Sequence, residues 1–118
     1  MTMQFLPANI YSVASVREID RRAIEEYDIS GYTLMQRAAA ASVQVARQRY
    51  PDAKRWQVIT GPGNNGGDGY VAARLAAQDG IVVSVVTMVD PDSLSGDAAT
   101  AYQDFAAEGG IVMPWSGE

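Results

Sequence analysis

Residues 56–75, WQVITGPGNNGGDGYVAARL, decide the fold of this chain. Trp56 to Thr60 is a short β-rich run, and glycines follow it at once, which is the pattern of a strand that feeds a tight turn. A helix is then expected over residues 68–79, with Gly80 as its C-terminal cap. The stretch therefore predicts a strand, a glycine-rich loop and a helix, in that order.

The sequence after this helix repeats the strand and helix pattern. Residues 81–89 are almost all apolar and many are β-branched, so they predict a strand that is buried on both faces. A turn at residues 91–93 precedes a helix that Ser95 is expected to cap and that runs to Ala107. Residues 111–113 predict a third strand. Because crossover helices join the strands, all three should lie parallel.

Two helices are expected before the first strand. Residues 15–18, SVRE, form a capping-box pattern, which predicts a helix that starts there and ends near Asp28. A second helix is expected from Thr33 to Tyr50, where Pro51 stops it. The chain therefore predicts an α/β fold, a Rossmann-like three-layer sandwich with a parallel sheet, in which two N-terminal helices precede β-α-β-α-β.

The composition fits one folded domain and excludes several kinds of chemistry. The chain has 118 residues, of which 47% are hydrophobic and 19% are charged. It contains no cysteine and no histidine, which excludes disulfides, thiolate metal sites and every Ser-His or Cys-His catalytic pair. Proton transfer would therefore depend on Asp, Glu, Tyr or Lys54.

The charge distribution and hydropathy argue against two classes of partner. The net charge is -5, with eight Lys/Arg against six Asp/Glu in residues 1–60 and one against eight in residues 61–118. Nucleic-acid binding normally needs a basic stripe, which this pattern lacks.

Residues 1–14 do not resemble a signal peptide, and the apolar stretch 81–89 is far shorter than the ~20 residues of a membrane helix. We therefore expect a cytoplasmic protein with no nucleic-acid or membrane partner.

The glycine loop, residues 61–69, is the candidate ligand site. Unpaired N–H groups and the helix dipole favour an anion where a strand turns into a helix. Gly61, Gly63 and Gly66 satisfy G-x-G-x-x-G, and Asp90 follows the next strand, where an acid would meet the ribose of a dinucleotide. A flexible turn without a ligand is the less favoured interpretation.

Other residues of the loop argue against a nucleoside triphosphatase and suggest a cation or sugar site. The loop also has Walker A spacing, but Gly67-Asp68 replaces the Lys-Ser/Thr that would hold a terminal phosphate and magnesium, so nucleoside triphosphate hydrolysis is not expected. Asn64, Asn65 and Asp68 offer amide and carboxylate oxygens. These oxygens would suit a hard monovalent cation or sugar hydroxyls, or they would only cap the turn.

Residues 61–75 closely resemble the signature of the NAD(P)H-hydrate epimerase family, also called the YjeF N-terminal domain. Residues 16–20, 34–39 and 94–98 also look like that family, so the resemblance covers nearly the whole chain. Residues 1–118 are thereby identified as the N-terminal part of such a domain, one that stops after the third strand.

The resemblance implies an isomerase of metabolite repair. Such an enzyme interconverts the R and S forms of hydrated NADH or NADPH at carbon six of the nicotinamide ring, and a fused or separate dehydratase then restores the cofactor. Matched by motif, Asn64, Asn65, Gly66, Gly67 and Asp68 would contact the hydrated dinucleotide. Asn65 would also bind a potassium ion.

The catalytic residue is unassigned, because the family's domain continues through further strands that carry its acid–base residue. Those strands also carry a second ligand loop and further potassium ligands, and residues 1–118 have no match for them. Homo-oligomerisation and the choice between the two hydrates stay open. The alternative functions are a noncatalytic binding or scaffold module of the same fold and a fragment of an ordinary NAD(P) dehydrogenase, which Pro62 and the paired asparagines fit poorly.

Overall fold

The computed structural model describes residues 13–26 and 28–117, except for the side chains at positions 13–17, 20, 23, 64 and 65. The chain divides after Gly31 into two compact units, and each is described by itself. None of the described helices is long and apolar enough to cross a membrane.

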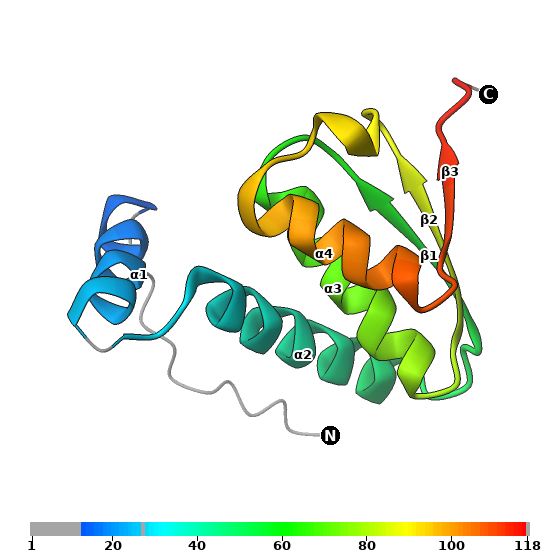
Figure 1. Ribbon diagram of the computed structural model, residues 1–118. Coiled ribbons are helices and arrows are strands. Elements are labelled where there is room, and N and C mark those ends of the chain that lie inside the picture. Colours follow the sequence, from blue (N-terminus) through cyan, green and yellow to red (C-terminus); the bar gives the residue numbers. More distant parts are fainter. Residues whose placement is uncertain (1–12, 27, 118) are drawn as a thin grey trace. The chain divides into compact units, whose positions relative to one another are not determined.

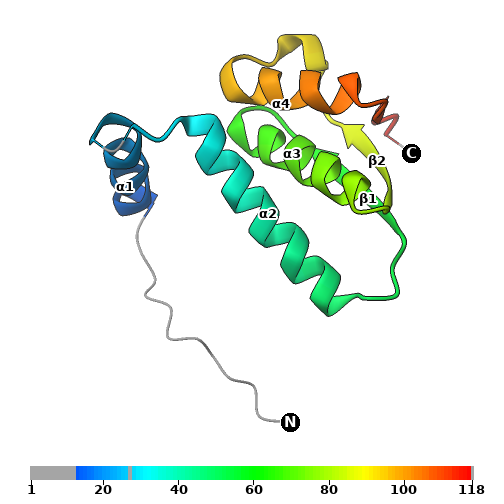
Figure 2. The same ribbon diagram turned by 60° about the horizontal axis from the view of Figure 1, so that its bottom comes forward.

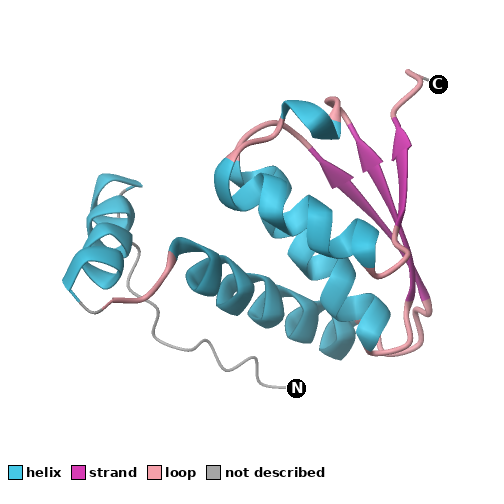
Figure 3. Ribbon diagram, in the orientation of Figure 1, coloured by secondary structure: helices cyan, strands magenta, loops and turns pink. Residues whose placement is uncertain are grey.

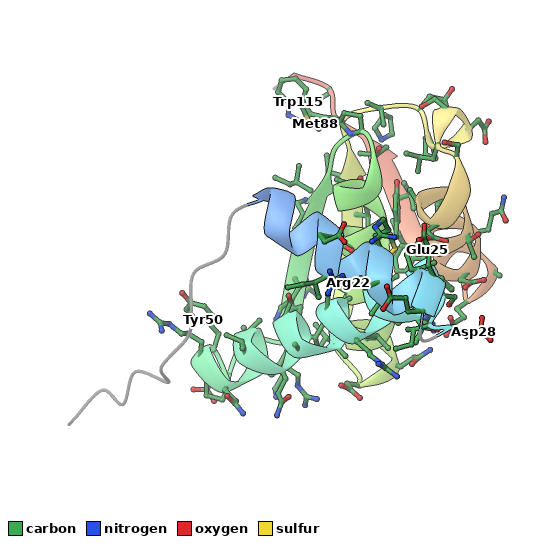
Figure 4. All side chains as sticks on the ribbon, turned by 90° about the vertical axis from the view of Figure 1, so that its left-hand side faces the viewer. Arg22, Glu25, Asp28, Tyr50, Met88 and Trp115 are labelled. Carbon is green, nitrogen blue, oxygen red and sulfur yellow. The ribbon has the colours of Figure 1, made fainter. Side chains whose placement is uncertain are left out.

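In the described part of the first unit, residues 13–26 form one helix, α1 (Val13–Glu26). It begins two residues before Ser15, so the predicted capping box lies inside the helix and does not start it. Glu18 accepts hydrogen bonds from Arg21 at 2.6 Å and from Arg22 at 3.2 Å, and these bonds lower its pKa to about 2. Such exposed pairs contribute little to stability. Arg22 is among the side chains labelled on this helix (Figure 4).

The second unit is built on a sheet of three parallel strands in the order β1-β2-β3 (Figures 1 and 3). The predicted element order and the parallel sheet are confirmed. The elements are α2 (Gly31–Arg49), β1 (Arg55–Thr60), α3 (Asn64–Gln78), β2 (Val82–Thr87), the 3-10 helix η1 (Pro91–Ser93), α4 (Gly96–Ala107) and β3 (Ile111–Pro114).

The helices of this unit form one layer, in which α3 lies between α4 and α2 (Figures 1 and 2). Tyr70 of α3 is fully buried, and its ring packs edge-on against Tyr102 of α4, with the ring centres 5.3 Å apart. The core also contains Phe105 of α4 and Val85 of β2. Helix α2 contributes three buried residues that are spaced four apart and so share one side of the helix: Met35, Ala39 and Val43.

The sheet is covered on one face only within this unit. Val83, Val85 and Thr87 of β2 are buried against the helices, whereas Val82 is 61% exposed. The expectation that residues 81–89 are buried on both faces is therefore wrong for this chain. Both crossover helices, α3 and α4, lie on the same face, and no described helix of this unit covers the other (Figure 1).

Candidate ligand site at the glycine loop

The glycine loop joins the carboxyl end of β1 to the amino end of α3. Helix α3 starts at Asn64 and not at the expected Asp68, so residues 64–67 are its first turn. Gly63 precedes the helix with a φ of 77°, a conformation that side chains other than glycine rarely adopt. The N–H of Gly66 donates to the Gly63 carbonyl at 3.1 Å, which closes the turn. The first N–H groups of α3 are thus brought to the carboxyl edge of the sheet, where a helix favours an anion.

Close packing explains two of the predicted site residues, Gly66 and Gly67. A Cβ atom on Gly66 would lie 2.4 Å from the carbonyl oxygen of Gly61. A Cβ atom on Gly67 would lie 2.7 Å from the methyl carbon of Met35 and 2.9 Å from the Cα atom of Ala98. Both glycines are buried, so helices α2, α3 and α4 meet at the start of the loop helix with no room for a side chain.

A second helix begins beside the loop. Ser95 occupies the position before α4, as expected, but its side chain makes no capping hydrogen bond to the helix. A cavity of about 120 Å³ opens between the two helix starts. Its lining comes from the glycine loop and from the segment before and at the start of α4: Pro62, Gly63, Ser93, Leu94, Ser95 and Ala98. The amino ends of two helices therefore border one small cavity, which the sequence motif alone did not predict.

Asp68 lies one turn into α3 and is half-buried. Burial raises the pKa of its carboxyl above the usual value, because desolvation disfavours the charged form. None of the described basic side chains forms an ion pair with it. The predicted ligands Asn64 and Asn65 lie in the turn before it, and their side chains are not described. Asp68 is therefore a partly desolvated acceptor beside the loop.

Asp90 has a structural role in this fold. A carboxylate oxygen of Asp90 accepts a hydrogen bond from the N–H of Asp92 at 2.9 Å, and its carbonyl accepts one from Ser93. Asp90 thereby caps η1. This use of the carboxylate weakens the dehydrogenase alternative, in which the same group would bind a ribose.

The described residues contain no cluster of metal-binding side chains. Within the part of the chain that the structure describes, no three or more His, Cys, Asp or Glu side chains gather as a metal-binding group. A larger cavity of about 450 Å³ lies between α2 and α3 and is lined by Val43, Leu75 and the Arg47–Asp79 ion pair, whose atoms are 2.9 Å apart. Its lining includes no residue of the glycine loop, so the smaller cavity is the better candidate.

Asp68→Asn is expected to change how stability depends on pH. A raised pKa means that the folded state holds the Asp68 proton more tightly, so this group stabilises the fold at low pH and loses that contribution as pH rises through its folded pKa. The stability of the parent relative to Asp68→Asn should therefore be greater at pH 3 than at pH 7. Urea unfolding of both proteins at the two pH values measures this difference. The pKa of the exposed Glu18 is lowered and not raised, but Glu18 is present in both proteins, so its effect cancels in the comparison. An unchanged or reversed difference would contradict the assignment.

Comparisons with known proteins agree with the resemblance seen in the sequence. Residues 31–116 match the family described as YjeF-related protein N-terminus. The chain is 40% identical over 107 residues to the bifunctional NAD(P)H-hydrate repair enzyme Nnr of Escherichia coli K12, which covers 91% of this chain and 21% of that protein. It is 39% identical over 102 residues to the NAD(P)H-hydrate epimerase of Bordetella pertussis, which covers 86% of this chain and 43% of that protein.

A solved structure has the same fold. The crystal structure of the yeast protein ynu0 matches with a TM-score of 0.80 at 23% identity, over 93% of this chain and 49% of that chain. The chain thus spans less than half the length of each of these two curated relatives and of the yeast protein.

Proposed function

Because the chain belongs to the family of YjeF-related protein N-termini, we propose that it binds the dinucleotide in an NAD(P)H-hydrate epimerase, an isomerase of nicotinamide-nucleotide repair. The observation that carries the proposal is the cavity between the amino ends of α3 and α4. A phosphate of hydrated NADH or NADPH binds there, because backbone N–H groups and helix dipoles stabilise an anion without basic side chains. A fused or separate dehydratase would then act on the product.

The residues of the loop have separate roles in this proposal. Asn64, Asn65, Gly66, Gly67 and Asp68 contact the hydrated dinucleotide. The glycines allow the close approach of the helices, and the Ser95 hydroxyl, which does not cap its own helix, is available to the phosphate. These groups bind and orient the ligand, while the acid–base residue is not assigned.

A potassium ion is part of the proposal, with Asn65 as one of its ligands. Amide and carboxylate oxygens are the donors that hard cations prefer. Asp68, three residues further along α3, adds a half-buried carboxylate with no ion pair among the described residues, so the donor set fits such an ion. A bound potassium ion would supply a fixed positive charge beside the dinucleotide.

The noncatalytic alternative is a binding or scaffold module with the same fold. A scaffold has no need for a cavity at two helix starts or for a half-buried carboxylate beside the glycine loop. Titration with hydrated NADPH separates the two functions, because a scaffold should not bind this compound in preference to an unrelated phosphate. Specific binding supports the repair function, and its absence supports the scaffold.

Asn65→Ala is expected to weaken dinucleotide binding by roughly 10-fold and to remove its dependence on potassium, because the cation loses an oxygen ligand. Calorimetric titration with hydrated NADPH, in potassium or tetramethylammonium salt at equal ionic strength, measures both effects. Gln78→Ala is the matched control, since Gln78 is an exposed amide at the far end of the same helix, where it donates to Glu108 at 2.8 Å. Equal affinities of Asn65→Ala and the parent in both salts would refute the assignment.

A further inference from the structure

Two large apolar side chains lie exposed at the carboxyl edge of the sheet, away from the residues so far placed at the site. Met88 directly follows β2 and is 48% exposed, and Trp115 directly follows β3 and is 55% exposed. In the view of Figure 4 the two labelled side chains lie close to each other near the top. Exposed clusters of this kind mark binding surfaces more often than isolated apolar residues do.

Backbone hydrogen bonds hold both residues in place. The N–H of Met88 donates to the Thr60 carbonyl of β1, and the N–H of Trp115 donates to the Thr87 carbonyl of β2, each at 2.9 Å. Pro114 pairs with Thr87 in the sheet register, so Trp115 and Met88 occupy the next paired positions. The two side chains therefore continue the parallel ladder and share one side of it.

Their distance from the glycine loop suits a nucleotide. Neighbouring strands are about 4.8 Å apart, so the end of β3 lies roughly 10 Å from the end of β1, where the loop begins. Ligands of open parallel sheets bind outside the carboxyl ends of the strands. In a dinucleotide one ribose separates each base from the phosphates. A phosphate in the cavity between Gly63 and Ser95 would let its base extend over the carboxyl edge of the sheet toward Met88 and Trp115, which alternate with the buried Val85 and Thr87 and so lie on the face that the helices leave uncovered.

We propose that Trp115 and Met88 form a stacking platform for a base of the bound dinucleotide. The indole offers a wide π surface, and the methionine thioether is polarisable and adapts its shape to a ring. Stacking on an aromatic side chain accepts any planar base, so the platform adds affinity at the base while the loop holds the phosphate. This inference rests on the proposed dinucleotide site, but it assigns residues outside the family motif.

The fluorescence of Trp115 tests the platform directly. The chain has two tryptophans, and Trp56→Phe leaves Trp115 as the only indole. AMP, nicotinamide mononucleotide and NADPH are titrated against this variant, with ribose 5-phosphate as the ligand that has no base. Quenching by AMP identifies the adenine end, and quenching by nicotinamide mononucleotide identifies the other end. Ribose 5-phosphate should not quench. If Trp56→Phe does not fold, the difference between the parent and Trp115→Phe gives the same signal.

Trp115→Ala supplies the affinity test. It is expected to bind NADPH roughly 5- to 150-fold more weakly than the parent, the range that loss of one base stack produces, while ribose 5-phosphate binding stays unchanged. Tyr50→Ala is the control, because Tyr50 is also an exposed aromatic residue (65%) and lies just beyond the C-terminal end of α2.

The remaining outcomes overturn the platform in distinguishable ways. Equal NADPH affinity of Trp115→Ala and the parent refutes the platform and leaves the proposed function standing. No binding of any nucleotide by the parent contradicts both. A blue shift of Trp115 emission that depends on protein concentration and that nucleotides do not reverse means that a second copy of the chain covers the two residues, which also refutes the platform.

Discussion

The 118-residue chain by itself is expected to convert R-hydrated NADPH to the S form about 10²–10⁴-fold more slowly than the Bordetella pertussis epimerase, because the proposed site would position the ligand and none of its residues is assigned to proton transfer. The sequence has no histidine. Of the two acids near the loop, Asp90 already accepts the N–H of Asp92, and Asp68 is proposed to contact the ligand. A site that only positions the hydrated dinucleotide lacks the rate enhancement that general acid–base catalysis provides.

The measurement is a time course from the pure R form, with the two epimers separated by chromatography and a protein-free sample giving the background rate. Size-exclusion chromatography of the same preparation shows which oligomer is assayed. Rapid conversion would place the acid–base residue within residues 1–118. Asp68→Asn would then identify or exclude the first candidate, since it keeps the shape of the side chain and removes the carboxylate.

Gly66→Ala is expected to destabilise the fold by about 2–3 kcal/mol, although alanine is the better helix former by about 1 kcal/mol. The added Cβ atom would lie 2.4 Å from the Gly61 carbonyl oxygen, which is backbone and cannot swing aside as a side chain could. Thr60 directly precedes Gly61, and its carbonyl accepts a 2.9 Å hydrogen bond from the N–H of Met88, the residue after β2. The Gly61 carbonyl is therefore held in place. The steric clash therefore outweighs the gain in helix propensity.

Gly61→Ala is the matched control for this prediction. A Cβ atom on Gly61 would meet nothing within 4 Å, so the change should alter stability by less than about 0.5 kcal/mol. Urea unfolding followed by far-UV circular dichroism compares the two variants with the parent. Equal stability of both variants would mean that the loop relaxes around position 66, and the packing explanation would be wrong.

The order of the elements could be predicted because local signals mark their ends. Pro51 follows the end of α2 closely, and Gly80 and Gly109, both with positive φ, follow α3 and α4. The start of α3 was missed for the opposite reason. Glycine usually marks a turn, but Gly66 and Gly67 lie inside the helix, at positions where neighbouring atoms leave no room for a side chain.

The sequence could not predict features that depend on tertiary contacts. The Cα atom of Ala98 lies against Gly67, 31 positions earlier, and this approach brings Ser95 to the glycine loop. No local pattern encodes that distance. The sequence also did not predict that one face of β2 is exposed. Exposed Val82 and buried Val83 and Val85 are the same residue type, so no alternation of polar and apolar residues marks the two faces. The predicted contacts of Asn64 and Asn65 stay predictions.

The uncovered sheet face also affects how stability varies with temperature. Ile59, Val82 and Ile111 are already in contact with water in the folded state, so their unfolding exposes little additional apolar surface. The heat capacity of unfolding scales with that additional surface and should fall below the usual 12–15 cal/mol/K per residue, which is roughly the value for fully covered domains. A smaller heat capacity gives a flatter stability curve. The free energy of unfolding of this chain should therefore change less between cold and warm conditions than that of a domain covered on both faces.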